Sequence, residues 1–188
     1  MKKSKSSKSK SENGAANKPE REDFLIVGIG ASAGGIQALK QFFGNVPADS
    51  GAAYVVILHL SPEHESHLAE VLQTNSRISV TQVTEKVKVE PNNVFVVSPN
   101  QSLAMADGHI VVSPIKTVEE RRAPVDIFFR TLAESNHERA VCVVLSGTGA
   151  DGSMGLKRVK ECGGVVFVQN PREAEYNDMV RNLSLIHI

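Results

Sequence analysis

One glycine-rich stretch near the N-terminus, residues 24–35, most constrains how this chain can fold. Its first four residues are apolar, and small residues with a single hydroxyl, that of Ser32, follow them. A short apolar run of this kind is typical of a buried parallel strand. Glycine accepts positive φ at no steric cost, so a sharp turn is expected from Gly28, Gly30, Gly34 and Gly35. Residues 36–43 then show helical spacing, which places Ser32 on a strand-to-helix turn.

Two different chemistries use a turn of this shape. Residues 30–34 fit G-x-S-x-G, the turn that exposes a nucleophilic serine at the end of a sheet strand. Residues 28–33 also fit G-x-G-x-x-A, a loose form of the dinucleotide-binding fingerprint. Each match is weak alone, so the rest of the chain has to decide between them.

The remaining apolar runs predict an α/β fold: a doubly wound, mostly parallel sheet with helices on both faces and one antiparallel hairpin. The hairpin is expected around Asp107-Gly108, and residues 116–123 are interpreted as a charged loop. Further strands are predicted at 53–58, 78–81, 94–97, 140–145 and 165–168, with helices at 61–73, 124–136 and 153–162.

Composition predicts a disordered basic tail (1–23) in front of a single folded domain. The tail holds seven Lys or Arg against four Asp or Glu, which favours a solubilising segment over an electrostatic tether. The whole chain has a net charge of zero, which argues against nucleic-acid binding. It has neither a signal peptide nor a run long enough for membrane insertion. Cys142 and Cys162 are interpreted as buried hydrophobes without a disulfide, and a cytoplasmic protein is expected.

Three chemically active side chains follow three predicted strands: Ser32, His59 and Asp151. The carboxyl ends of parallel strands meet at one edge, where open sheets bind their ligands. A serine needs a base to take its proton, and an imidazole needs an acceptor to fix its orientation. Dinucleotide binding instead needs an acid after the second strand, and that position is His59. The pattern therefore favours a serine hydrolase, with nucleotide binding as the weaker alternative.

Simpler interpretations exist for each of these residues. Ser32 could cap the helix after it, as could Asp151, and His59 could be a satisfied strand-end histidine. Asp126, in the first turn of a predicted helix, is the rival for the orienting acid. A metal site at His59, His64 and His67 is disfavoured, because the spacing fits no zinc motif and Pro62 interrupts the helix.

Three segments of the chain resemble the signature segments of the chemotaxis protein-glutamate methylesterases: residues 28–35, 56–62 and 145–152. Residues 123–129 resemble the start of a helix in that family, and residues 169–176 resemble its closing segment. The resemblance implies Ser32 as nucleophile, His59 as base and Asp151 as orienting acid. It implies backbone N–H groups of Ala33 and Thr148 as oxyanion donors, with neither cofactor nor metal.

The same resemblance implies hydrolysis of methyl esters on glutamates of methyl-accepting chemoreceptors, and deamidation of receptor glutamines. Residues 60–64 are similar to the subgroup fused to a receptor methyltransferase, so a fused or associated methyltransferase is an expected partner. Many family members carry a receiver domain before the esterase, whereas only the basic tail precedes Phe24 here. An inactive regulatory or docking module with the same fold is therefore the alternative. The resemblance implies a catalytic domain at 24–179 and stops after Met179, where Val180 replaces a proline of the family. Residues 180–188 are therefore expected to be an atypical or truncated C-terminal end.

Overall fold

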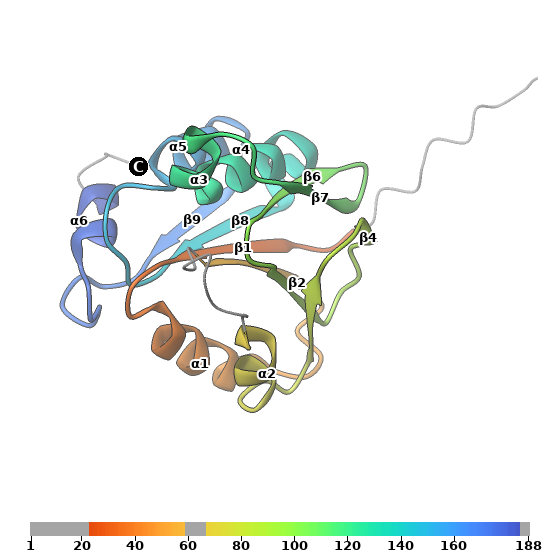
Figure 1. The fold of residues 1–188 in the computed structure, drawn as a ribbon. Coiled ribbons are helices and arrows are strands. Elements are labelled where there is room, and N and C mark those ends of the chain that lie inside the picture. Colours follow the sequence, from red (N-terminus) through yellow and green to blue (C-terminus); the bar gives the residue numbers. More distant parts are fainter. Residues whose placement is uncertain (1–22, 59–66, 185–188) are drawn as a thin grey trace, which may run out of the picture.

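The main sheet of the protein has six parallel strands (Figure 1). The computed structural model describes residues 23–58 and 67–184, so the basic tail, His59 and the last four residues lie outside the described part. The strand order along the sheet is β3 (Ser79–Val83), β5 (Asn93–Val97), β2 (Ala53–Leu58), β1 (Ile26–Ala31), β8 (Ala140–Val144) and β9 (Val165–Val168).

Helices cover both faces of this sheet. On one face lie α1 (Gly35–Asn45) and α2 (Leu68–Gln73), and on the other α4 (Pro124–Asn136) and α5 (Ser153–Glu161) (Figure 1). Two separate clusters of buried aliphatic and aromatic side chains fill the two helix–sheet layers. The predicted doubly wound α/β architecture is therefore confirmed. The part of the predicted 61–73 helix that precedes residue 67 lies outside the described residues.

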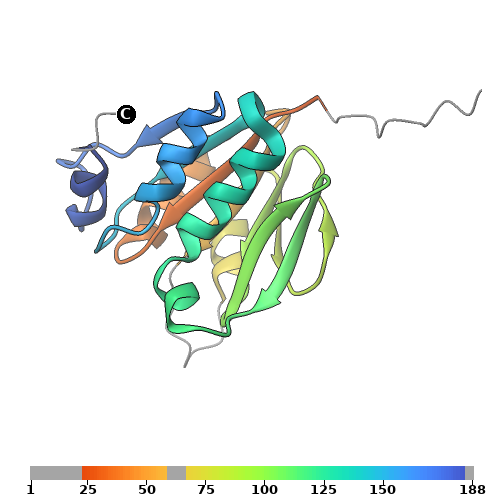
Figure 2. The ribbon, with the colours of Figure 1, turned by 90° about the horizontal axis from the view of Figure 1, so that it is seen from above.

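A second, antiparallel sheet is built around the predicted hairpin. It contains β4 (Val87–Lys88), β7 (His109–Pro114) and β6 (Gln101–Ala106), in that order. The hairpin turn has positive φ at both central residues, 49° at Asp107 and 72° at Gly108, as a tight two-residue turn requires. Figure 2 shows this sheet beside α4, over the same face of the main sheet. The hairpin prediction is confirmed, whereas the two-residue strand β4 was not foreseen.

The predicted charged loop at residues 116–123 is wrong, because the segment contains the short helix α3 (Val118–Arg122). Thr117 caps this helix, and its hydroxyl accepts a hydrogen bond from the Glu120 N–H (3.1 Å). The Glu120 carboxylate in turn accepts from the Thr117 N–H (3.4 Å), which completes a capping box. The T-x-x-E spacing is the sequence signal for this helix. The prediction of a loop followed the high charge of the segment and missed that spacing.

The glycines of residues 28–35 do not act as predicted. Gly28 and Gly30 lie inside β1, and of the four glycines only Gly34 has positive φ, at 71°. A side chain on Gly30 would place its Cβ 2.5 Å from a methyl carbon of Val125 in α4. One at Gly28 would meet Leu132 of the same helix at 3.0 Å. These two glycines therefore allow α4 to approach β1 closely, and the turn itself depends on Gly34.

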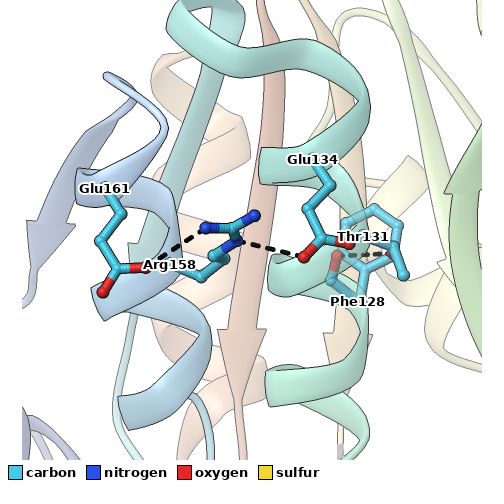
Figure 3. Close-up of polar contacts among 5 residues, drawn as sticks. All are labelled: Phe128, Thr131, Glu134, Arg158 and Glu161. Atoms are coloured by element: carbon cyan, nitrogen blue, oxygen red, sulfur yellow. Dashed lines mark hydrogen bonds and ion pairs between the residues drawn. The ribbon is translucent and has the colours of Figure 1, made fainter.

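Polar contacts hold α4 against its neighbours along its length. The Thr131 hydroxyl donates to the Phe128 carbonyl (3.0 Å) and accepts from the Met105 N–H of β6 (3.0 Å). Arg158 of α5 pairs with Glu134 of α4 and with Glu161 of its own helix (Figure 3). The Arg158 pairs are solvent-exposed, so each is expected to contribute little to stability.

The chain continues as part of the folded domain beyond Met179. Helix α6 (Asp178–Ser184) crosses the boundary proposed at that residue, and Val180 and Leu183 are fully buried in the core cluster that also contains residues of α4 and α5. A short 3-10 helix, η1 (His137–Arg139), leads into β8. Cys142 is a buried free thiol, as predicted, whereas Cys162, also a free thiol, is only half-buried. Burial raises the pKa of Cys142 well above its ordinary value. Among the described residues, no helix is long and apolar enough to cross a membrane.

Candidate active site

Ser32 lies directly after β1, at the carboxyl end of the sheet. Its N–H donates to the Ser146 carbonyl (3.0 Å), and its own carbonyl accepts from the Gly35 N–H (2.9 Å). The N-cap of α1 is Gly34, and no side chain caps that helix. The helix-cap interpretation of Ser32 is therefore wrong, and its half-buried side chain is not committed to α1.

The sheet topology places Ser32 at a switch point. β1 pairs on one side with β2 and on the other with β8, so the chain leaves β1 in one direction and later returns on the other side. Such points form the ligand-binding crevice of open α/β sheets. Leu58, the last described residue of β2, is the register partner of Ala31. His59 follows Leu58 outside the described residues, so its role as base stays a prediction.

The turn after β8 lies against the turn after β1. A Cβ on Gly147 would lie 3.0 Å from the Ser32 Cβ and 3.2 Å from the Ser32 nitrogen, so only a glycine fits there. Within the described part of the chain, the N–H groups of Ala33 and Thr148 donate no hydrogen bond. Both are therefore available as the oxyanion donors that the sequence resemblance implies, a role that stays a prediction.

Asp151 binds the first turn of a helix that lies elsewhere in the sequence. Its Oδ2 accepts from the Val125 N–H and its Oδ1 from the Asp126 N–H, both at 3.0 Å. These bonds cap α4, while the N-cap of α5, the helix after Asp151, is Gly152 without a side-chain bond. Asp151 was expected as a possible cap of the helix that follows it, α5. That prediction is wrong, because Asp151 caps α4 instead. The Gly152 N–H also stabilises this carboxylate. A carboxylate has about four acceptor positions, so an imidazole N–H can still bind.

The environment of Asp151 changes its acidity. Burial raises the pKa of Asp151 from 3.8 to about 6, although the N–H groups of Asp126 and Val125 oppose this rise by stabilising the charged form. The negative charge of Asp126 adds to the rise. Asp151 is therefore an acid that titrates close to the working range of a histidine base.

Asp126, the rival acid, has a different structural position. Its Oδ1 accepts a short hydrogen bond from the Gly155 N–H in the first turn of α5 (2.6 Å). Asp151 precedes α5 and caps α4, while Asp126 lies in α4 and binds the start of α5. The two carboxylates therefore brace the two helix N-termini reciprocally. The role of Asp151 as the orienting acid stays a prediction, because His59 lies outside the described residues.

Most of the histidines considered for a metal site lie outside the described residues. Of the histidines considered for a metal site, only His67 is described, and its ring nitrogen contacts Glu70 at 3.2 Å. Among residues 23–58 and 67–184, no three His, Cys, Asp or Glu side chains are grouped to hold a metal. Ser146 was not predicted from the sequence as a site residue, and its buried hydroxyl joins three segments at the site. A hydroxyl before a glycine at a strand end was the available signal.

Comparisons with known proteins agree with this geometry. The family model for CheB methylesterase matches residues 27–186. A Leptospira interrogans protein named for protein-glutamate methylesterase/protein-glutamine glutaminase activity is 32% identical over 161 residues, 85% of this chain and 83% of that protein. A Burkholderia orbicola protein-glutamate methylesterase/protein-glutamine glutaminase is 33% identical over 73% of this chain, which spans only 42% of that relative.

A solved structure shows the same fold. The crystal structure of the Thermotoga maritima CheB methylesterase catalytic domain superimposes with a TM-score of 0.78 and 26% sequence identity. The match covers 87% of this chain and 88% of that one. The hydrolase interpretation of the glycine-rich turn is confirmed at the level of the family, and the dinucleotide alternative finds no support.

Proposed function

Because the chain belongs to the CheB methylesterase family, we propose that Ser32 is the nucleophile with which it hydrolyses methyl esters of protein glutamates. One observation carries this proposal: the Ser32 turn and the glycine-rich turn after β8 touch at the switch point of the sheet. In the part of the chain that the structure describes, the N–H groups of Ala33, next to Ser32, and of Thr148, next to Gly147, donate no hydrogen bond, which supports their role as oxyanion donors.

The first half of the proposed reaction forms an acyl-enzyme. His59 takes the proton from the Ser32 hydroxyl as its Oγ attacks the ester carbonyl carbon. The N–H groups of Ala33 and Thr148 stabilise the resulting oxyanion, and Asp151 orients the imidazole. Collapse of the tetrahedral intermediate breaks the bond to the methoxy oxygen. The imidazolium returns its proton to that oxygen, and methanol leaves.

The second half regenerates the enzyme. Water loses a proton to His59 and attacks the acyl carbon. The tetrahedral intermediate then collapses, the imidazolium returns its proton to the Ser32 Oγ, and the glutamate product leaves and ionises to its carboxylate. A glutamine side chain reacts through the same acyl-enzyme, with ammonia leaving in place of methanol. Every proton in this scheme moves between substrate, water and the three side chains, so the proposal requires no cofactor.

The proposed reaction implies two partners, a protein that carries the methyl ester and an enzyme that makes the ester. The CheB family acts on chemoreceptors, and we propose methylated chemoreceptor glutamates as the substrate of this chain in the cytoplasm. The esters have to be made by a methyltransferase. The likeness of residues 60–64 to the fused subgroup supports a fused or associated enzyme of that kind.

The test is methanol release from a methylated chemoreceptor, measured for the wild-type chain and for Ser32→Ala. We expect the substitution to lower kcat by about 10³-fold or more, because no other group replaces the attacking oxygen. Ser113→Ala, an exposed serine of β7, is the matched control and should keep the wild-type rate. Equal rates for wild type and Ser32→Ala would contradict the proposal and favour the inactive docking module.

A further inference from the structure

We infer that Ser146 is a positioning residue of this active site, whose buried hydroxyl holds the Ser32–Ala33 turn in its reactive conformation. The inference rests on the proposed function, because it assigns Ser146 a task in the reaction of Ser32. Ser146 follows β8 and is only 1% exposed, although it carries a polar side chain. Buried hydroxyl groups are costly unless both their donor and acceptor capacities are used.

The hydroxyl of Ser146 uses both capacities at the site. It donates to the Ala33 carbonyl at 2.9 Å and accepts from the Tyr176 N–H at 3.0 Å. The Tyr176 carbonyl lies farther away, at 3.3 Å, and the hydroxyl has a single hydrogen to donate. The shorter contact therefore ties Ser146 to the nucleophile turn.

Ser146 holds that turn from two sides. Its carbonyl accepts from the Ser32 N–H (3.0 Å), while its hydroxyl holds the Ala33 carbonyl. Between these two bonds lies the Ser32–Ala33 peptide, whose N–H is the proposed oxyanion donor. Fixing a peptide at both ends restricts its rotation, and such preorganisation is what an oxyanion hole needs.

Ser146 is in turn held by the segment that closes the domain. Its N–H donates to Oε1 of Gln169 at 2.7 Å. The neighbouring Gly147 donates to the Tyr176 carbonyl and accepts from the Met179 N–H, both at 3.0 Å. The turn also has no spare room, because a Cβ on Gly34 would lie 2.8 Å from the Ser146 Oγ. Ser146 thus connects the β1 turn to a segment more than a hundred residues away.

The experiment compares two Ser146 variants with a control variant that removes another hydroxyl with the same hydrogen-bonding pattern. Ser146→Ala removes the hydroxyl and is the smaller side chain, whereas Ser146→Cys is slightly larger than serine and donates hydrogen bonds only weakly. Thr131→Val is the control, because the Thr131 hydroxyl also joins a backbone carbonyl to a backbone N–H, between α4 and β6. All chains are assayed for kcat and KM of methanol release from a methylated chemoreceptor. Their melting temperature and the amide hydrogen exchange of residues 28–36 are also measured.

We expect both Ser146 variants to lose about 10- to 100-fold in kcat with KM changed by less than about threefold, because misplacement of reacting groups acts on the chemical step. Amide exchange in residues 28–36 should rise about tenfold or more. Thr131→Val should lower the melting temperature comparably while kcat and that exchange stay at wild-type values. If Ser146→Ala fails to fold, the kcat and the amide exchange of Ser146→Cys test the inference.

Two results would overturn the inference: a kcat of both Ser146 variants within threefold of Thr131→Val, or unchanged exchange in residues 28–36. Failure of the proposed function gives a different pattern. The wild-type chain would then release no more methanol than Ser32→Ala, while the exchange measurement would still report whether Ser146 holds the turn.

Discussion

At the scale of single residues, Asp151 has a structural role in the fold and is also the predicted orienting acid of the site. Its two oxygens cap α4, and burial raises its pKa to about 6. As the pH falls through that value, the carboxyl gains a proton and loses the charge that would stabilise an imidazolium. Esterase activity that depends on Asp151 is therefore expected above about pH 6 and lost below it. Histidine titrates in the same range, so Asp151 has to be observed directly.

Asp126→Asn should lower the pKa of Asp151, because removing the neighbouring negative charge favours the ionised carboxylate. Asparagine keeps an oxygen that can accept from the Gly155 N–H, so the brace on α5 is retained. A carbon-13 NMR titration of the carboxyl groups would measure the change. Asp107→Asn, at the exposed hairpin turn, removes an equal charge and should leave Asp151 unchanged. An unchanged or raised Asp151 midpoint in Asp126→Asn would contradict this account.

At the scale of elements, the packing of α4 on β1 decides where the site lies. Two glycines of β1 admit the side chains of Val125, Phe128 and Phe129, and this close approach brings the N-terminus of α4 to the carboxylate of Asp151. A bulkier strand would push α4 away and open both hydrogen bonds of that carboxylate. The site therefore depends on small residues that carry no chemistry of their own.

Gly30→Ala should destabilise the protein by about 1–3 kcal/mol, because its Cβ would lie 2.5 Å from a Val125 methyl carbon in a filled core. Gly44→Ala in α1 is the matched control. Its Cβ would come no closer than 3.9 Å to another residue, so alanine should stabilise the helix by roughly 0.5–1 kcal/mol. Urea unfolding followed by circular dichroism measures both changes. A Gly30→Ala chain as stable as wild type would contradict the close packing.

At the scale of the whole molecule, long-range contacts join the closing segment to the sheet. Helix α6 places Val180 and Leu183 in the same core as α4 and α5. The family match likewise extends to residue 186. The part of the chain after Met179 thus belongs to the packed domain at least as far as the described residues extend.

Leu183→Ala should lower the free energy of unfolding by about 2–5 kcal/mol, the usual cost of deleting a fully buried leucine. Arg181→Ala, exposed on the same helix, should change it by less than about 0.5 kcal/mol. Thermal and urea unfolding of the two variants test the difference. Equal stability of both variants would mean that α6 is not part of the cooperative core.

The sequence by itself determined the fold class, the strand-end positions of Ser32 and Asp151, and the hairpin. These features follow from local patterns: apolar runs, helical spacing and turn residues report on neighbouring residues in the chain. The methylesterase family was also recognisable from three short segments. The pairing of His59 with Ser32 and Asp151 stays a prediction from those segments.

Only the tertiary structure decided what Gly28, Gly30, Asp126 and Ser146 do. Each acts on a partner distant in sequence: α4 against β1, the start of α5, or the Ser32 turn joined to the closing segment. Local patterns carry no information on which helix approaches which strand, or on which carbonyl a buried hydroxyl meets. Those choices follow from the packing of the whole core. The sequence therefore predicts the position of the Ser32 turn but not the long-range contacts that hold it.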